Sequence, residues 1–556
     1  MGKVIKRIRV VLCLVEKVGV ADDDAIEQVQ HEKSSSLTNI ILCEQWQEQT
    51  QTYESQVGEK ALYSKQLVQP KYCPFILGTL ESMTGMLLGL DMSTISGANL
   101  FMPQYLHLDT KQFSLVSSGA ALGAIPGAIL LTPINEWIGR KYTLIVCCLI
   151  FTVGAILEAA AHSYGTMIAG RLLVGVGIGL SSTAPVCVSE SVKKEIRGKL
   201  VVLFQFNITV GEVIGYVVAA IFVNVPGNWR FMLGSSLLWS SLLLLFILFL
   251  PESPWWLMKK GRKAQSFLVW KRIRSFENLE SITEFFEMEK AVLEERKLAQ
   301  ARPFYWLDII RVPRSARAFI VANVLAGIVQ LDGINSVVYY IGVLFKELGF
   351  SAEKSVYMSL VGGGSLMAGT IPAILLLDKW GRRMVGIGPS IVVFLGCIII
   401  GCSFLAKNTK TYEGVYIWGL ITYELFSGSF QSLPWLNFAE VYPTYLKSVG
   451  MTIADAFIYL WAFTVTYNFT GMRHAMTNTG LFVGFYGGIS LFGVIFLVLF
   501  LPELKGKTLE EVDVIFSQPM SEIARANLRS SINTLKKLFT GRWKEIVQTD
   551  SQVLDN

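Results

Sequence analysis

Ionisable side chains interrupt the long apolar stretches of this chain, and six of them lie in otherwise apolar surroundings: Asp91, Arg171, Glu212, Asp332, Glu424 and Asp455. A charge inside a lipid-like stretch is costly, so such residues are rare and often mark ion or proton pathways. A buried acid beside a cation stays charged until a proton releases the pair. If an acid and the arginine of this group lie together, proton binding can therefore bias one conformation. The alternative is a permanent ion pair that only joins two helices.

Short charged motifs form a second candidate group, because each occurs twice, about 250 residues apart. Gly139-Arg140-Lys141 recurs as Gly381-Arg382-Arg383, with an acid three residues before each glycine. Glu190 precedes Arg197 by seven residues, as Glu440 precedes Lys447, and Pro251-Glu252 recurs as Pro502-Glu503. A parallel repeat of this kind is typical of transporters that rock two halves about a central site.

The repeated acids and bases fall at the expected ends of helices, where pairs between them can lock the halves in one conformation and separate in the other. The alternative is that they are solvated topology signals, since single exposed ion pairs contribute little stability. Repetition in register favours a cytoplasmic gate, with these candidates: Glu136, Arg140, Glu190, Arg197, Glu252, Asp378, Arg382, Arg383, Glu440 and Lys447.

The composition indicates the elements that position these residues. Of 556 residues, 52% are hydrophobic and only 17% are charged, against about 25% charged in soluble proteins. This excludes a nucleic-acid binder, a disordered protein and an ordinary cytosolic enzyme. The eight cysteines show neither disulfide nor zinc spacing, the four histidines are scattered, and no P-loop is present. We therefore expect no metal, no cofactor, no enzymatic activity and no ATP-driven pumping.

Twelve apolar runs have about the 20 residues that cross a bilayer, near 75–99, 114–134, 143–161, 165–189, 200–223, 230–250, 317–346, 355–377, 384–405, 412–438, 449–470 and 479–501. The predicted fold is an all-α membrane protein of two six-helix halves, 71–250 and 317–501, related by a parallel repeat. Residues 1–70 and 502–556 read as tails, and 251–316 as a linker with short amphipathic helices. Because Lys and Arg gather in the loops after even-numbered runs, both tails and the linker are expected in the cytoplasm.

Taken together, these motifs resemble the sugar porter family of the major facilitator superfamily, in its fungal form. The matching segments cover about 75–510 and include Glu136 to Lys141, Gly170-Arg171, Pro251 to Pro254, Gln330 to Asn335, and Pro434-Trp435. The resemblance implies alternating-access transport of a monosaccharide or polyol in symport with protons. It also implies a monomer in contact with membrane lipid, in the plasma membrane, with no nucleic-acid partner.

By position, the resemblance implies a substrate site built from Gln205, Gln330, Asn335, Tyr339 and Trp435. Amides donate and accept hydrogen bonds at once, as sugar hydroxyls do, and an indole can pack on a sugar ring. The alternative is ordinary hydrogen bonding between helices. Proton-coupled members that resemble this chain carry an acid at the position of Asp91, paired with the arginine at Arg171. Glu212 is a rival proton carrier.

The chain also departs from the family pattern at positions near the implied site. Val329 stands where a first glutamine is usual, Asp332 replaces a hydroxyl residue, and Ser427 replaces an acid. An Asn-Trp pair reads Ile458-Tyr459, and a later asparagine is Ala462. A site that loses such partners discriminates against the sugar that needed them, so a pentose, fructose or a polyol fits as well as glucose. A uniporter and a transporter-like sugar sensor remain alternative functions.

Overall fold

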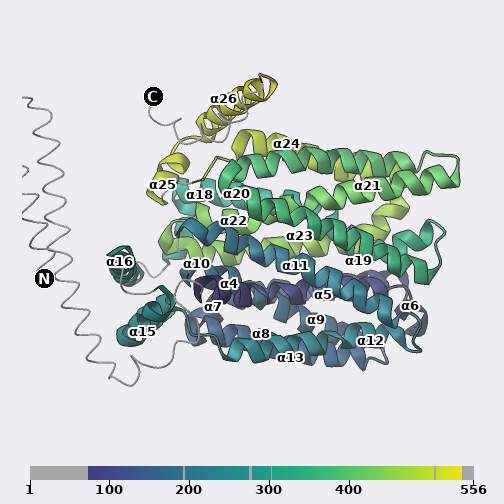
Figure 1. The fold of residues 1–556 in the computed structure, drawn as a ribbon, viewed down its shortest axis with the longest axis horizontal. Coiled ribbons are helices and arrows are strands. Elements are labelled where there is room, and N and C mark those ends of the chain that lie inside the picture. Colours follow the sequence, from purple (N-terminus) through teal and green to yellow (C-terminus); the bar gives the residue numbers. More distant parts are fainter. Residues whose placement is uncertain are drawn as a thin grey trace, which may run out of the picture.

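The computed structural model describes residues 73–191, 194–274, 279–301, 304–505, 507 and 509–540, and the described chain is helical from end to end (Figure 1). Most helices run side by side along one axis. The first half occupies one side of the bundle and the second half the other. The segment between the halves and the helices after residue 508 gather at one end, which we call the linker end.

The first half contains ten helices, and a break divides some of its spans into two neighbouring helices. The ten are α4 (Cys73–Ser82), α5 (Gly85–Ala98), α6 (Met102–Tyr105), α7 (Thr110–Ile138), α8 (Arg140–Ala159), α9 (Tyr164–Ser181), α10 (Thr183–Ser191), α11 (Lys194–Phe222), α12 (Asn228–Gly234) and α13 (Ser236–Leu248). Side chains cap some starts. For example, the Ser163 hydroxyl accepts a hydrogen bond from the N–H of Thr166 at the start of α9, which satisfies a donor left open by helix geometry.

The second half follows the same plan: α18 (Pro313–Leu331), α19 (Ile334–Glu347), α20 (Ala352–Ser403), α21 (Thr409–Phe430), α22 (Ser432–Val441), the short η2 (Thr444–Leu446), α23 (Lys447–Ala475), the π-helical η3 (Gly480–Tyr486) and α24 (Gly487–Phe500). Helix α20 is two helices, because the backbone at Gly381 has a φ of 84°. Two helices follow the half: α25 (Leu509–Ser517) and α26 (Met520–Phe539).

Within the described residues, ten helical stretches are long and apolar enough to cross a membrane. The other two predicted runs, near 75–99 and 412–438, correspond to α4 with α5 and to α21 with α22, each divided by a break. The twelve predicted runs therefore each have a helical counterpart. Their boundaries shift by several residues, most of all where a run continues into a polar turn.

Small residues let the helices of the first half approach closely. A Cβ added at Gly123 would lie 2.2 Å from the carbonyl oxygen of Leu172, and one at Gly175 would lie 2.2 Å from that of Ala120. Larger side chains would push α7 and α9 apart. In a bilayer, close packing of this kind replaces the hydrophobic effect as the source of helix association.

The predicted linker helices are α14 (Pro254–Lys259), α15 (Lys263–Arg274) and α16 (Leu279–Ala301), followed by η1 (Tyr305–Leu307) and α17 (Asp308–Arg311). Their apolar faces share a small core of their own, which includes Phe267, Trp270 and Phe285. The linker expected at 251–316 therefore does contain short helices.

Candidate functional site

A narrow cavity lies between the two halves, and all five residues of the predicted substrate site line it. Gln205 enters from the first half, and Gln330, Asn335, Tyr339 and Trp435 enter from the second. Apolar side chains such as Met92 and Ile178 complete the wall. The cavity measures about 50 Å³, and a single water needs about 10–15 Å³. A sugar-sized ligand must therefore rearrange the side chains that close it.

Gln205 is the polar centre of the cavity and joins the two halves. Its Oε1 accepts a hydrogen bond from the indole N–H of Trp435 at 2.9 Å, and its Nε2 donates to Oε1 of Gln431 at 3.1 Å. Gln205 is 2% exposed, so these bonds form in a nearly dry environment. A ligand hydroxyl that displaced either bond could replace it in kind, because a hydroxyl both donates and accepts.

The break between α18 and α19 presents two further amides to the cavity. The Asn335 amide donates to Oε1 of Gln330, and the carboxylate of Asp332 accepts from the N–H of Ile334 at 3.1 Å. Gly333 turns the chain with a φ of 102°, and a Cβ there would lie 2.8 Å from the ring of Tyr486. Only glycine fits this turn, since other residues are strained at that φ and would meet the ring.

Tyr339 connects the cavity to the end of the bundle opposite the linker. Its carbonyl accepts from the Asn99 amide at 3.2 Å, across the two halves. The Ser117 hydroxyl donates to Oδ1 of Asn99 at 3.2 Å, and Nη2 of Arg171 lies 3.4 Å from the Ser117 carbonyl. A chain of hydrogen bonds therefore runs from Arg171 to a contact that closes the halves.

Asp91 and Arg171, which the sequence pairs only by resemblance, are in contact. The guanidinium donates to both carboxylate oxygens, with Nη2 3.1 Å from Oδ2. Nε of Arg171 donates to the Val116 carbonyl at 3.0 Å, and Nη1 lies 3.4 Å from Oε1 of Glu158. All three charged residues are at most 2% exposed. Two acids thus share one buried cation.

Glu212, the rival proton carrier, lies elsewhere on the cavity wall. It is 2% exposed, and within the described part of the chain its Oε2 has no hydrogen-bond partner. Glu424 of α21 lies near enough for the two charges to repel. Asp455 is 3% exposed, and within the described part of the chain neither of its carboxylate oxygens has a hydrogen-bond partner.

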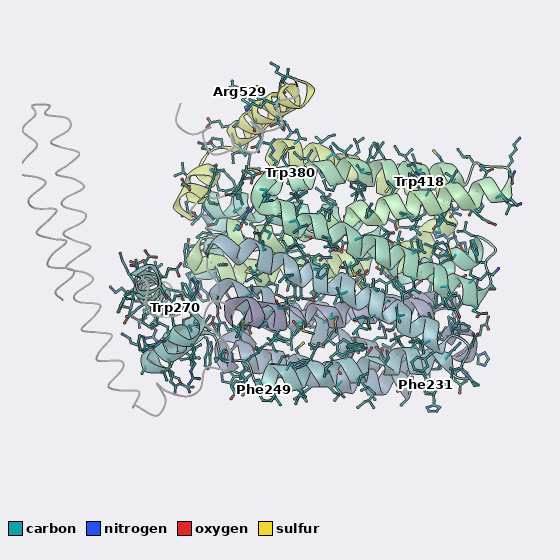
Figure 2. The ribbon with its side chains drawn as sticks, viewed as in Figure 1. Phe231, Phe249, Trp270, Trp380, Trp418 and Arg529 are labelled. Carbon is teal, nitrogen blue, oxygen red and sulfur yellow. The ribbon has the colours of Figure 1, made fainter. Side chains whose placement is uncertain are left out.

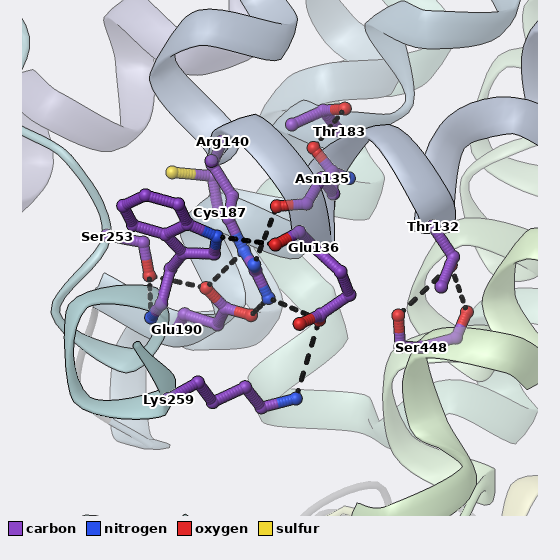
Figure 3. A network of polar contacts seen from close by, with 12 residues as sticks. Thr132, Asn135, Glu136, Arg140, Thr183, Cys187, Glu190, Ser253, Lys259 and Ser448 are labelled. Atoms are coloured by element: carbon purple, nitrogen blue, oxygen red, sulfur yellow. Dashed lines mark hydrogen bonds and ion pairs between the residues drawn. The ribbon is translucent and has the colours of Figure 1, made fainter. Parts of the chain in front are cut away.

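The repeated motifs at the linker end form matching networks, one in each half. In the first half, Nε and Nη2 of Arg140 donate to the two carboxylate oxygens of Glu190, at 3.1 and 2.8 Å (Figure 3). Nη2 also lies 3.4 Å from Glu136. Glu252 accepts from the N–H groups of Arg140 and Lys141 at 2.8 and 3.2 Å, and so caps the start of α8.

The second half repeats this arrangement at the equivalent residues. Nε and Nη2 of Arg382 donate to Glu440 at 3.1 and 2.7 Å, and Glu503 accepts from the N–H groups of Arg382 and Arg383 at 2.9 and 3.0 Å. Every one of these described ion pairs joins elements of a single half. In this conformation they hold each half together at its linker end, and a gate that locks the two halves to each other stays a prediction.

Contacts between the halves at the linker end come from hydroxyl groups instead. Thr132 of α7 contacts the hydroxyls of Ser448, at 3.0 Å, and of Thr452 (Figure 3). Deeper in the bundle, the Ser182 and Tyr459 hydroxyls lie 3.3 Å apart. Neutral bonds of this kind exchange readily with water, so they can open without stranding a charge.

The remaining four predicted gate residues are Arg383, Lys447, Arg197 and Asp378. Arg383 is buried and contacts Asn527 and Ser531 of α26, so it is not at the boundary between the halves. Lys447 begins α23. The side chains of Arg197 and Asp378 lie outside the described residues.

Three residues of the site were missed by reasoning from sequence. Gln431 lies four residues before Trp435, one helical turn away, and this spacing could have identified it. Glu158 is an acid inside the third apolar run, a signal of the same kind as Asp91. Tyr459 was noted only as a departure from the family, yet its ring lines the cavity.

The charge of Glu190 decides the electrostatics of the network in the first half. Burial alone would raise the pKa of its carboxyl, but the Arg140 guanidinium and the Ser253 hydroxyl lower it, and the net pKa is below the ordinary value. The Arg140–Glu190 pair is therefore fully charged at neutral pH.

Comparison with known proteins agrees with this geometry. The family model described as sugar (and other) transporter matches residues 42–516. A myo-inositol transporter of Gibberella moniliformis is 47% identical over 495 residues, which cover 88% of this chain and 86% of that protein. The arabinose-proton symporter of Escherichia coli K12 is 28% identical and covers 82% of this chain, with 96% of its own length matched.

A solved structure gives the same fold. The proton:xylose symporter of Escherichia coli, of the major facilitator superfamily, was determined with 6-bromo-6-deoxy-D-glucose bound. It superposes with a TM-score of 0.71 at 24% identity and covers 81% of this chain and 100% of its own. This likeness confirms the fold predicted from sequence, two halves of six membrane-spanning helices, and a multi-pass membrane protein.

Proposed function

We propose, from the premise that this chain belongs to the sugar (and other) transporter family, that it carries a cyclic polyol or a monosaccharide across the membrane in symport with protons. The observation that carries the proposal is the cavity between the halves, whose wall contains Gln205, Gln330, Asn335, Tyr339 and Trp435. The family consists of transporters, and we infer transport rather than catalysis.

A polyol such as myo-inositol is the substrate class that we favour. Four carboxamide side chains, those of Gln205, Gln330, Asn335 and Gln431, meet in one small space, and each can pair with a hydroxyl as donor and acceptor. A ring with a hydroxyl on every carbon offers such partners around its whole edge. The relative with 47% identity is a myo-inositol transporter, which supports the same choice.

Alternating access follows from how the halves meet. Hydrogen bonds between the halves lie on both sides of the cavity: Asn99 with Tyr339 at one end and Thr132 with Ser448 at the other. Because each is a neutral bond of modest net strength, about 0.5–1.5 kcal/mol, either side can open while the other stays closed. The ion pairs within each half keep the six helices together during the movement.

Proton coupling is proposed from a charge count at Arg171. If Asp91 and Glu158 are both ionised, the cluster with Arg171 carries one net negative charge in a buried position. One proton makes the cluster neutral, which a low-dielectric environment favours. Loading that proton on Asp91 releases Arg171 toward Glu158. The change can reach the contact between Asn99 and Tyr339 through Ser117.

The orientation and the oligomeric state belong to the same proposal. The linker end carries the dense Lys and Arg residues, so we place it in the cytoplasm, with both tails and residues 251–316. A cysteine introduced at the exposed Lys297 should then react only after cells are permeabilised. The cavity is complete within one chain, so we propose that the monomer is the functional unit.

Counterflow in proteoliposomes tests the transport proposal. Vesicles loaded with unlabelled myo-inositol should accumulate labelled myo-inositol when they contain this protein, and unlabelled xylose, glucose or fructose inside should support this less well. Labelled uptake equal to that of protein-free vesicles for every member of the panel would contradict transport and favour a sensor. Uptake best supported by glucose would keep transport and remove the polyol assignment.

A further inference from the structure

Helix α26 lies outside the twelve-helix bundle, against α24, near the linker end (Figure 1). It has 20 residues and begins three residues after α25 ends. Neither the cavity nor the paired networks of the two halves use it. Its position on the outer flank of a membrane-spanning helix therefore needs a separate explanation.

A buried arginine holds α26 in place. Nη1 of Arg383 donates to Oδ1 of Asn527 at 3.2 Å, and Nη2 donates to the carbonyl of Asn527 at 2.6 Å and to the hydroxyl of Ser531 at 2.8 Å. The Asn527 amide in turn donates to the carbonyl of Leu499 in α24 at 2.9 Å. These bonds fix the rotation of α26, so the direction of its other faces is defined.

The face of α26 turned away from the bundle is apolar along one stripe and basic along the next. Leu528 is 43% exposed and Ile532 is 44% exposed. They lie one turn apart on the same face. Arg525 and Arg529 form the adjacent stripe one turn apart, and both are exposed. Figure 2 shows Arg529 pointing away from the bundle.

The level of α26 along the bundle fits the surface of the membrane. Trp380, at the linker end of the first part of α20, is 46% exposed and lies at the level of α26 in Figure 2. Tryptophan is enriched where a bilayer meets water. The only acid between residues 520 and 540 is Glu522, against four bases, Arg525, Arg529, Lys536 and Lys537. These features are typical of helices that lie in the membrane interface.

We propose that α26 binds the anionic phospholipid headgroups of the cytoplasmic leaflet, with Leu528 and Ile532 among the upper acyl chains and with Arg525 and Arg529 on the lipid phosphates and carboxylates. The inference rests on the proposed orientation of the linker end but not on the substrate or on proton coupling. Through Arg383, which adjoins the Arg382–Glu440 pair, lipid binding on α26 is connected to the linker end of the second half.

The test uses the full-length protein in nanodiscs of pure phosphatidylcholine or of phosphatidylcholine with phosphatidylserine. A nitroxide is attached to Leu528→Cys, after the exposed Cys402 and the cysteines of the N-terminal tail are replaced by serine. The label is apolar and preserves the stripe. Its accessibility to oxygen, which concentrates in lipid, and to a water-soluble nickel chelate reports the depth of the helix.

Phosphatidylserine should move the label into lipid. Each basic residue near an anionic surface changes the ratio of lipid-bound to water-exposed helix about fivefold. The variant Arg525→Gln with Arg529→Gln should therefore lower that ratio roughly 25-fold. Its matched control is Lys290→Gln with Lys297→Gln, which removes two exposed charges from α16 and should leave the ratio unchanged.

Two results would overturn the proposal. One is a label equally exposed to water in both lipid compositions. The other is an equal change in the accessibility of the label in the two double variants. That result would point to a protein partner or to a second copy on this face. Because counterflow of substrate is measured on the same variants in proteoliposomes of the same two lipid compositions, a failure of transport is distinguished from a failure of lipid binding.

Discussion

Arg171 donates two hydrogen bonds to the carboxylate of Asp91, and its Nη2 lies 3.1 Å from Oδ2. The pair is buried, and the guanidinium is held on its other side by the carbonyl of Val116 at 3.0 Å. Because the backbone fixes Arg171, a change of charge on Asp91 cannot be absorbed by a swing of the arginine into water. It must be compensated by Glu158 or by movement of the surrounding helices.

The first prediction concerns Glu158. Glu158→Gln leaves one acid and one base, which are neutral together without a bound proton. Substrate-dependent proton uptake should fall to a small fraction of wild type, while equilibrium substrate binding stays the same. Dye-reported proton uptake and binding by isothermal titration check this. Glu294→Gln, an exposed acid on α16, is the control. Proton uptake at wild-type level in Glu158→Gln would show that Asp91 loads its proton independently.

The second prediction concerns the cavity. Gln205→Ala removes the partner of both the Trp435 indole and the Gln431 amide. Substrate binding should weaken by about 1–3 kcal/mol, since buried polar groups are left unpaired. Asn468→Ala removes an exposed amide that donates only to its own helix and should have no effect. Equal affinities for wild type and Gln205→Ala would place the substrate elsewhere.

The third prediction concerns the turn between α18 and α19. Gly333→Ala and Gly349→Ala each introduce a Cβ at a φ near 100°, but only the Cβ at Gly333 meets a neighbour, the ring of Tyr486. We expect Gly349→Ala to destabilise the protein by about 1–2 kcal/mol from backbone strain alone. Gly333→Ala should destabilise it further and displace Asn335. Thermal unfolding and substrate binding measure both. Identical losses of stability in the two variants would mean that the Tyr486 ring moves away from the added Cβ at little cost.

The fourth prediction concerns pH at the linker end. The folded pKa of Glu190 is lowered, so the stability from its ionised form is complete above the ordinary value of 4.5 and disappears as pH falls through the lowered value. Glu190→Gln leaves the buried Arg140 short of a charge partner and should destabilise the protein by about 3 kcal/mol.

That loss should be the same at about pH 5.5 and about pH 7.5, because neither pH protonates Glu190 in wild type. The pH profile of transport should keep its shape even if its amplitude falls. Thermal unfolding at both values and a pH series of uptake provide the test. A stability difference that shrinks toward the lower pH would show that Glu190 already takes up protons there.

The sequence predicted more of the site than of the contacts that close it. Repeated motifs and apolar runs led to twelve helices in two halves, and matched positions led to five residues that line one cavity. The spacing of Gln431 from Trp435 pointed to it, but its hydrogen bond with Gln205 joins residues 226 positions apart, and a hydropathy pattern does not show such a contact.

The gate was the least predictable part for a related reason. Acids and bases that recur in register indicate where helices end, but not whether their partners belong to the same half. In the structure Arg140 forms an ion pair with Glu190 on α10, and Arg382 forms one with Glu440 on α22. Arg383 has a neighbour, α26, that lies more than 130 residues later in the chain. Such contacts follow from tertiary packing, which short motifs do not encode.

Proton movement coupled to substrate, at zero membrane potential in proteoliposomes, tests the central claim. Wild type should acidify the vesicle interior when myo-inositol is added outside, and Asp91→Asn should not. Asp91→Asn should still perform counterflow, because its neutral side chain leaves Arg171 paired with Glu158. Substrate entry without protons in wild type, or accumulation against a gradient by Asp91→Asn, would contradict this account; the first result identifies a uniporter, and the second moves proton coupling to another acid such as Glu212.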